Sequence, residues 1–89
     1  MKKIRRTNRF KRLYKERIVV SEHLKRDFID SVEAFREDRT LVDDHPLSDV
    51  MHGRRSFSIN SDYRVIYIEK ADEYVFVDIG THEQVYRRS

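Results

Sequence analysis

The chain has 89 residues, of which 39% are charged, with no cysteine and a formal net charge of +3. A chain of this length has room for one hydrophobic core, so we expect a single domain spanning residues 1–89. The lack of cysteine excludes disulfides and thiolate metal sites, and no apolar run approaches the roughly 20 residues of a membrane helix. No apolar segment follows the basic N-terminus, so we expect no secretory signal and a cytoplasmic protein.

The charges are unevenly distributed along the chain. Residues 1–17 carry nine Lys or Arg residues against Glu16 alone, whereas residues 18–51 carry four basic and nine acidic residues. Residues 52–89 are balanced, with six of each sign. A basic arm next to an acidic middle favours binding to a polyanion, and a merely solvated terminus is the alternative.

The first half predicts a short strand and two amphipathic helices. Residues 3–6 are expected to form an edge strand, after which Thr7 can cap a helix. The apolar residues of this helix recur at helical spacing: Phe10, Leu13, Tyr14 and Ile18. A second helix is predicted over 21–38 with Ser21 as its N-cap. Its apolar residues recur every three to four positions: Leu24, Phe28, Val32 and Phe35.

The second half predicts three strands. Pro46 ends any helix before it and pushes His45 towards extended geometry. Strands are then expected over 54–60, 63–68 and 74–79, where alternating or apolar runs are separated by polar turns. Short connections between neighbouring strands favour an antiparallel meander.

The predicted fold class is therefore α+β, with two N-terminal helices packed on a small, mainly antiparallel β-sheet. Two helices cover one sheet face and leave the other partly open, which is a natural place for a site. The tail, residues 81–86, is too short for an independent element. We expect it to lie against the sheet edge or to cross the open face.

Candidate site residues fall on this predicted face. Arg64 interrupts an otherwise apolar strand, where a cation is costly unless it is paired or exposed to an anion. Arg55 lies on the adjacent predicted strand. His82 and Tyr86 follow the third strand and can close over the same face.

Three further residues lie beside these. His45 enters just before the sheet, and a hydrogen-bonded hinge is the alternative to a catalytic role. Asp62 lies in the turn before the second strand, where it can also simply cap the turn. Arg54 is either solvated or meets a partner.

This combination suits RNA cleavage by the 2′-hydroxyl of the RNA itself. The reaction needs a base or orienting group for that hydroxyl, cations around the pentavalent phosphorus and an acid for the 5′-oxygen. Histidine can act as acid or base near neutral pH, arginine matches phosphate oxygens, and a tyrosine ring can stack on an unpaired base. None of this requires a metal, and the sequence shows no dense carboxylate or histidine cluster that would hold one.

Four motifs in order resemble toxins of the RelE/StbE family, within the RelE/ParE superfamily. The motifs span residues 45–86 and are His45-Pro46-Leu47-Ser48, Gly53-Arg54-Arg55-Ser56-Phe57-Ser58-Ile59, Asp62-Tyr63-Arg64-Val65-Ile66-Tyr67, and Gly80-Thr81-His82 with Val85-Tyr86. The His-Pro-Leu and Gly-Thr-His elements make the YafQ branch look nearest. The pattern departs from that branch at Ser58, where a histidine is usual, and at Tyr63, where a tryptophan is usual.

The resemblance implies the toxin of a bacterial type II toxin–antitoxin system. Such a toxin is an mRNA interferase that enters the ribosomal A site and cuts mRNA there without metal or other cofactor, leaving a 2′,3′-cyclic phosphate. It implies a cognate antitoxin as partner, typically acidic and partly disordered before it wraps the toxin. Operator DNA would be met only through that antitoxin.

The resemblance also assigns roles by position. His45, Asp62, His82 and Tyr86 match active-site positions, with His82 as the general acid or base. Arg64 matches the strand arginine that contacts the scissile phosphate. Further substrate contacts are expected from Arg55 and Arg54.

Three rival functions make different predictions. A ParE-like gyrase poison would share the fold and cause DNA damage without mRNA cuts, although His82 and Arg64 argue against it. A catalytically inactive antitoxin-binding module would be unaffected by His82→Ala and Arg64→Ala. A general nucleic-acid-binding protein would bind naked RNA in a salt-dependent way without cleaving it.

Overall fold

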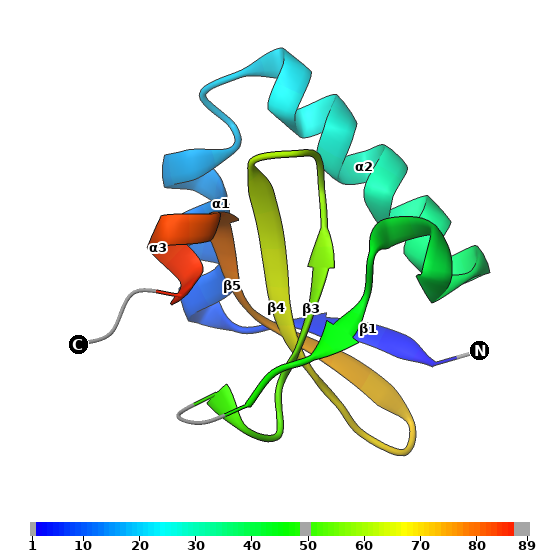
Figure 1. Ribbon diagram of the computed structural model, residues 1–89. Coiled ribbons are helices and arrows are strands. Elements are labelled where there is room, and N and C mark those ends of the chain that lie inside the picture. The colour runs from blue at the N-terminus through cyan, green and yellow to red at the C-terminus, as the bar shows by residue number, and fades with distance from the viewer. Residues whose placement is uncertain (1, 49–50, 87–89) are drawn as a thin grey trace.

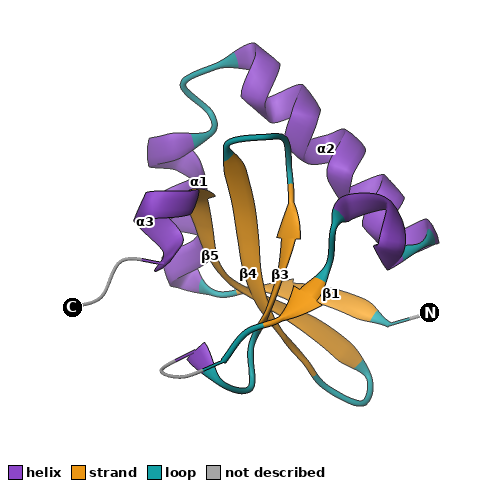
Figure 2. Cartoon of the chain, viewed as in Figure 1, coloured by secondary structure: helices purple, strands orange, loops and turns teal. Residues whose placement is uncertain are grey.

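The computed structural model describes residues 2–48 and 51–86, and Figures 1 and 2 show how their helices and strands are arranged. The elements follow in the order β1 (Lys3–Arg6), α1 (Asn8–Arg17), α2 (Glu22–Glu37), the 3₁₀ helix η1 (Arg39–Val42), β2 (His45–Pro46), β3 (Arg55–Ser58), β4 (Tyr63–Glu69), β5 (Glu73–Thr81) and α3 (His82–Tyr86). In the described part of the chain, the strands form one sheet in the order β1-β5-β4-β3-β2. The pair β1–β5 is parallel and the other neighbouring pairs are antiparallel. The predicted α+β class is confirmed, and the predicted helices and strands are found within a few residues of their expected ends.

Both predicted helix starts are made by hydroxyl caps. The Thr7 side chain accepts a hydrogen bond from the Phe10 amide at 3.1 Å, and Ser21 accepts one from the Leu24 amide at 3.3 Å. Each cap satisfies an amide that has no partner inside the first helical turn. The two helices therefore begin where the sequence predicts.

An aromatic cluster joins the helices to one face of the sheet. Phe35 of α2 stacks on Phe57 of β3 with ring centroids 4.6 Å apart, and its ring also meets Tyr67 at 5.1 Å. Phe10 of α1 lies 5.4 Å from Phe76 of β5. These rings belong to one buried cluster, which anchors α1 and α2 on the same sheet face.

The tail forms a short helix, so the expectation that 81–86 contains no element of its own is wrong. The reason is a capping box: Thr81 Oγ1 accepts from the Gln84 amide at 3.2 Å, and Gln84 Oε1 accepts from the Thr81 amide at 2.8 Å. The resulting helix, α3, packs on β4 and β5 and buries Val85. As expected, it crosses the sheet face opposite the aromatic cluster, the face that also carries Ser56 and Arg64.

At the turn into α3, two side chains from other elements pack closely against Gly80. A Cβ atom on Gly80 would lie 2.5 Å from Gln84 Oε1 and 2.8 Å from Arg17 Nη1. The same Arg17 nitrogen donates to the Ile79 carbonyl at 3.0 Å. The Gly-Thr-His motif thus has a structural role, because α1, β5 and α3 come into close contact at Gly80.

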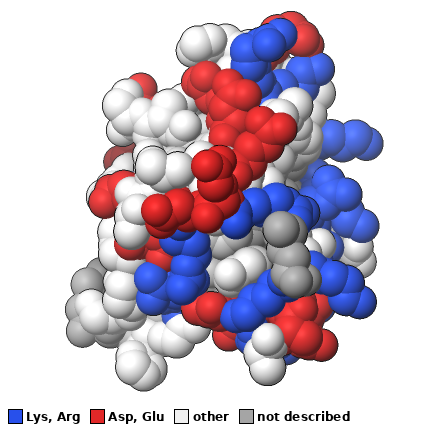
Figure 3. All heavy atoms as spheres, turned by 90° about the vertical axis from the view of Figure 1, so that its right-hand side faces the viewer, with Lys and Arg blue, Asp and Glu red and all other residues white. Residues whose placement is uncertain are grey.

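The surface keeps the charge separation of the sequence. Exposed basic residues cluster along α1: Arg9, Lys11, Arg12 and Lys15. A hollow of about 450 Å³ beside α1 is lined by these residues: Arg6, Phe10, Lys11, Arg12, Tyr14 and Lys15. On the face shown in Figure 3, a band of acidic side chains runs beside basic ones. No helix within 2–48 or 51–86 has the length and hydropathy needed to cross a membrane.

Truncating Phe35 tests the aromatic cluster. Phe35→Ala should lower the free energy of unfolding by about 3–5 kcal/mol, because it opens a cavity between four aromatic rings, whereas Phe35→Leu should cost less. Val20→Ala, at a residue that is 76% exposed, serves as the control and should change stability by less than about 0.5 kcal/mol. Urea denaturation measures all three variants, and equal losses for Phe35→Ala and Val20→Ala would contradict this packing.

Candidate active site

Arg64 lies in the candidate site, and each of its three guanidinium nitrogens contacts at least one acceptor. Its side chain is 12% exposed, and Nε donates to the Ser56 hydroxyl at 2.5 Å. Nη2 donates to the Asp43 carbonyl at 2.9 Å, and Nη1 lies 3.3 Å from the Asp43 carboxylate. Since a guanidinium has donors only, these oxygens keep the cation stable in a mostly apolar strand.

His45 also faces Arg64, and its contacts define its tautomer. Nε2 lies 3.3 Å from Arg64 Nη2, and Nδ1 lies 3.2 Å from the Pro46 carbonyl. Because the guanidinium can only donate and the carbonyl can only accept, Nε2 accepts and Nδ1 carries the proton. In this tautomer the Nε2 lone pair of His45 faces the cation.

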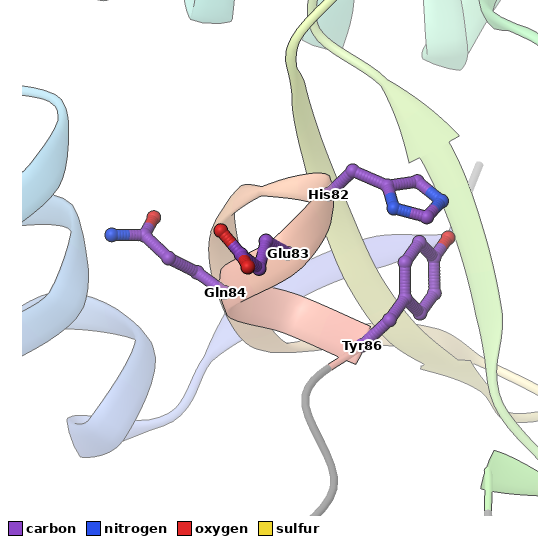
Figure 4. Close-up of a pocket in the computed structure, with 4 residues that line it drawn as sticks. All are labelled: His82, Glu83, Gln84 and Tyr86. Carbon is purple, nitrogen blue, oxygen red and sulfur yellow. The ribbon is translucent and has the colours of Figure 1, made fainter.

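His82 and Tyr86 approach the same point from α3, where one helical turn places them side by side (Figure 4). Their ring centroids are 4.4 Å apart in an edge-on arrangement. The Tyr86 hydroxyl donates to Ser56 Oγ at 2.7 Å, and the His82 amide donates to the Asp62 carbonyl at 3.1 Å. Ser56 thus links Arg64 and Tyr86, and Asp62 supports the start of α3 through its backbone.

These side chains line an open pocket of about 390 Å³, called the Arg64 pocket here: Asp43, His45, Arg64, His82 and Tyr86. A neighbouring hollow of about 580 Å³ shares His82 and Tyr86 and adds Glu83 and Gln84 (Figure 4). Small-ligand sites usually occupy volumes of this order. The Arg64 pocket offers a cation, two imidazoles and a phenol, a set that can bind a phosphate and move protons around it.

Four of the predicted site residues meet in this pocket: His45, Arg64, His82 and Tyr86. The Asp62 side chain is exposed at the end of the turn. Its hydrogen bond with His82 is made by the Asp62 backbone carbonyl. Arg54 is exposed and its carbonyl accepts from the Leu47 amide at 2.9 Å. Neither is among the residues that line the Arg64 pocket.

The expectation that Arg55 shares a face with Arg64 is wrong. Arg55 Nη2 and Nε lie 2.5 and 2.9 Å from Asp44 Oδ1, and Nε also donates to the Tyr67 hydroxyl at 3.2 Å. The physical reason is strand alternation: Ser56, not Arg55, shares the face of Arg64, so Arg55 points towards the aromatic core. The Tyr67 hydroxyl also donates to Asp44, completing what we call the Asp44 cluster: Asp44, Arg55 and Tyr67.

Sequence reasoning missed Ser56 and Asp43. The alternation that separates Arg55 from Arg64 could have placed Ser56 beside Arg64. Asp43 carried no such signal, since its role depends on a left-handed backbone conformation (φ 50°, ψ 50°). Ser58, where the YafQ branch usually has a histidine, lies outside the pocket lining and donates to the Asn60 carbonyl at 2.6 Å.

Solved structures of several bacterial toxins share this fold. A copper-bound mutant toxin from Helicobacter pylori matches with a TM-score of 0.78 at 18% identity, over 97% of this chain and 100% of that one. YafQ from E. coli strain BL21(DE3) matches with a TM-score of 0.74 at 18% identity, over 97% and 99%. YafQ in the E. coli DinJ-YafQ complex matches with a TM-score of 0.71 at 21% identity, also over 97% and 99%.

The family assignment comes from the sequence. Residues 2–87 match the model of a family described as the bacterial toxin of type II toxin-antitoxin system, YafQ. The chain therefore belongs to the YafQ toxin family, as its motifs predict. A search of curated protein sequences found no significant match.

Tyr67 provides a pH test of the Asp44 cluster. Burial and the hydrogen bond to Asp44 raise the pKa of Tyr67 well above its usual value near 10, outweighing the opposite effect of Arg39 and Arg55. The unfolded chain therefore ionises first, so the stability contributed by protonated Tyr67 is complete below about pH 10 and falls as the pH rises above it.

Between roughly pH 10 and 11.5, the free energy of unfolding should fall more steeply for the wild type than for Tyr67→Phe. The difference in slope should approach about 1.4 kcal/mol per pH unit, the value for one proton. Urea denaturation at a series of pH values measures it. Parallel curves would show that Tyr67 ionises equally easily in both states.

Proposed function

We propose that this toxin is a cytoplasmic, ribosome-dependent endoribonuclease that cleaves translated mRNA without a metal. The observation that carries the proposal is the Arg64 guanidinium, which lines an open pocket together with two histidines. Family membership supports an RNA-directed toxin, and the pocket supports the phosphate chemistry that such a toxin needs.

In the proposed reaction, the scissile phosphate binds Arg64. The 2′-oxygen attacks phosphorus and loses its proton to a base, while the bond from phosphorus to the 5′-oxygen breaks and that oxygen takes a proton from an acid. The products are a 2′,3′-cyclic phosphate and a 5′-hydroxyl. Arg64 stabilises the charge that develops on the phosphate oxygens.

The histidines fit the two proton transfers. His45 has an unprotonated Nε2 beside Arg64, which suits the acceptance of the 2′-hydroxyl proton. His82 is exposed, lines the same pocket and suits the donation of a proton to the leaving oxygen. Tyr86, oriented by its bond to Ser56, can hold the edge of a base or of the ribose.

The surface supports two kinds of macromolecular partner. The basic side chains of α1 suit contact with ribosomal RNA, because neutralising phosphates drives such binding. The E. coli relative occurs in a complex with DinJ, which supports a cognate antitoxin for this chain as well. Operator DNA would be reached through that antitoxin.

Cleavage should depend on Arg64 and His82. In a cell-free translation reaction, primer extension should show mRNA cuts with the wild type, about 100-fold fewer with Arg64→Ala, and a similar loss with His82→Ala. Lys70→Ala, which removes an exposed cation from the β4–β5 loop, is the matched control and should cut normally. Uncut mRNA with the wild type would reject the proposal, and DNA damage without cuts would favour a gyrase poison instead.

The reaction should also proceed without divalent metal at the toxin. Because ribosomes need magnesium, the test pre-treats the toxin with EDTA, removes the chelator and compares initial cutting rates in one translation mix. We expect rates within about twofold of the untreated toxin, since the proposed proton transfers and charge stabilisation use side chains alone. A loss restored by adding back a transition metal would contradict the mechanism.

A further inference from the structure

Arg64 already has an anion beside it in the free protein. The Asp43 carboxylate lies 3.3 Å from Nη1, on a guanidinium whose other contacts are to neutral groups: the Ser56 hydroxyl, the Asp43 carbonyl and His45. Asp43 also lines the Arg64 pocket. Among residues 2–48 and 51–86, Asp43 is the only acidic residue whose carboxylate forms an ion pair with Arg64.

Asp43 is held in this position by its backbone. It ends η1 in the left-handed region, which Asp and Asn tolerate better than most residues. The next residue, Asp44, is anchored in the core by Arg55 and Tyr67, with its side chain 1% exposed. The backbone conformation of Asp43 and the anchored side chain of Asp44 therefore hold the Asp43 carbonyl where it accepts from Arg64.

The Asp43 carboxylate itself is not fixed in the same way. Its side chain is 76% exposed, and its contact to Nη1 is the longest of the Arg64–oxygen contacts. An exposed ion pair of this kind contributes little free energy, so an incoming anion can replace it at low cost. The carbonyl contact to Nη2 can persist when the carboxylate turns into solvent.

We propose that the Asp43 carboxylate is an internal competitor of the phosphate group that binds Arg64. In the free toxin it neutralises the cation, and a phosphate displaces it from Nη1. Asp43 therefore weakens phosphate binding and raises the RNA concentration at which the site fills. The part of this inference that concerns RNA depends on the proposed function, whereas the competition for phosphate does not.

The competition is measured on the purified toxin with inorganic phosphate as the probe. Phosphate is titrated into the wild type, Asp43→Asn and Asp72→Asn, and the side-chain NMR signals of His82 and His45 report occupancy of the pocket. Asp43→Asn keeps the shape and the left-handed backbone but removes the charge. Asp72→Asn removes the same charge from the exposed β4–β5 loop and controls for net charge.

The dissociation constant for phosphate should fall roughly two- to fivefold in Asp43→Asn, the size expected for losing a solvent-exposed like charge, and stay near the wild-type value in Asp72→Asn. Adding Arg64→Ala should abolish the titration in each background. Unchanged or weaker binding by Asp43→Asn would overturn the proposal, and so would equal tightening in both single variants. Backbone NMR spectra establish that the variants are folded.

Cleavage kinetics separate this inference from the proposed function. With translated mRNA, Asp43→Asn should lower KM while kcat is kept, because only the competition for the ground-state anion is lost. A fall in kcat at unchanged phosphate affinity would instead make Asp43 part of the catalytic chemistry and overturn the inference. If the wild type cut no mRNA while Asp43→Asn still bound phosphate more tightly, the proposed function would fail and the competition would stand.

Discussion

The site depends on one requirement: the guanidinium of Arg64, placed in an apolar strand, has to be surrounded by acceptors. A buried cation is tolerated only when its donors are bonded. Here β3 supplies the Ser56 hydroxyl, the segment before β2 supplies Asp43, and β2 begins with His45. The need to satisfy one charge therefore draws separate parts of the chain to one point. A phosphate that arrives there meets donors already oriented, which reduces the reorganisation that catalysis would otherwise require.

The segment that bonds Arg64 is held from the opposite side of the sheet. Asp44 bonds Arg55 and Tyr67 in the core, while its neighbours Asp43 and His45 bond Arg64 on the pocket side. Alternation along the chain lets three consecutive residues serve both faces. Tyr67 also contacts Phe35, so the aromatic packing under α2 and the geometry of the pocket are mechanically connected. This connection gives Asp44 and Arg55 a structural role where the motif comparison implied a substrate contact for Arg55.

The sequence predicts local features of this protein better than it predicts which side chains of different elements contact one another. The caps at Thr7 and Ser21 and the strand alternation were readable, because neighbouring residues determine them. The helix α3 was also readable in principle from the spacing of Thr81 and Gln84, but its short length hid it. The face of Arg55 was misjudged because its place on the strand next to Arg64 was taken to put both arginines on the open face, where alternation puts Ser56 instead. The Arg55 partner Asp44 lies in the segment before β2, where the sequence pattern predicts no pairing, and the left-handed backbone of the neighbouring Asp43 carries no local signal.

The most direct test of the central claim is the chemistry of the RNA ends. Cleavage by the internal 2′-hydroxyl must leave a 2′,3′-cyclic phosphate on the upstream fragment and a 5′-hydroxyl on the downstream one. Mass spectrometry of fragments from a translated mRNA treated with the wild-type toxin identifies both ends. We predict these two groups, with little product when ribosomes are omitted. A 5′-phosphate on the downstream fragment, or equal cutting of naked RNA, would contradict the account.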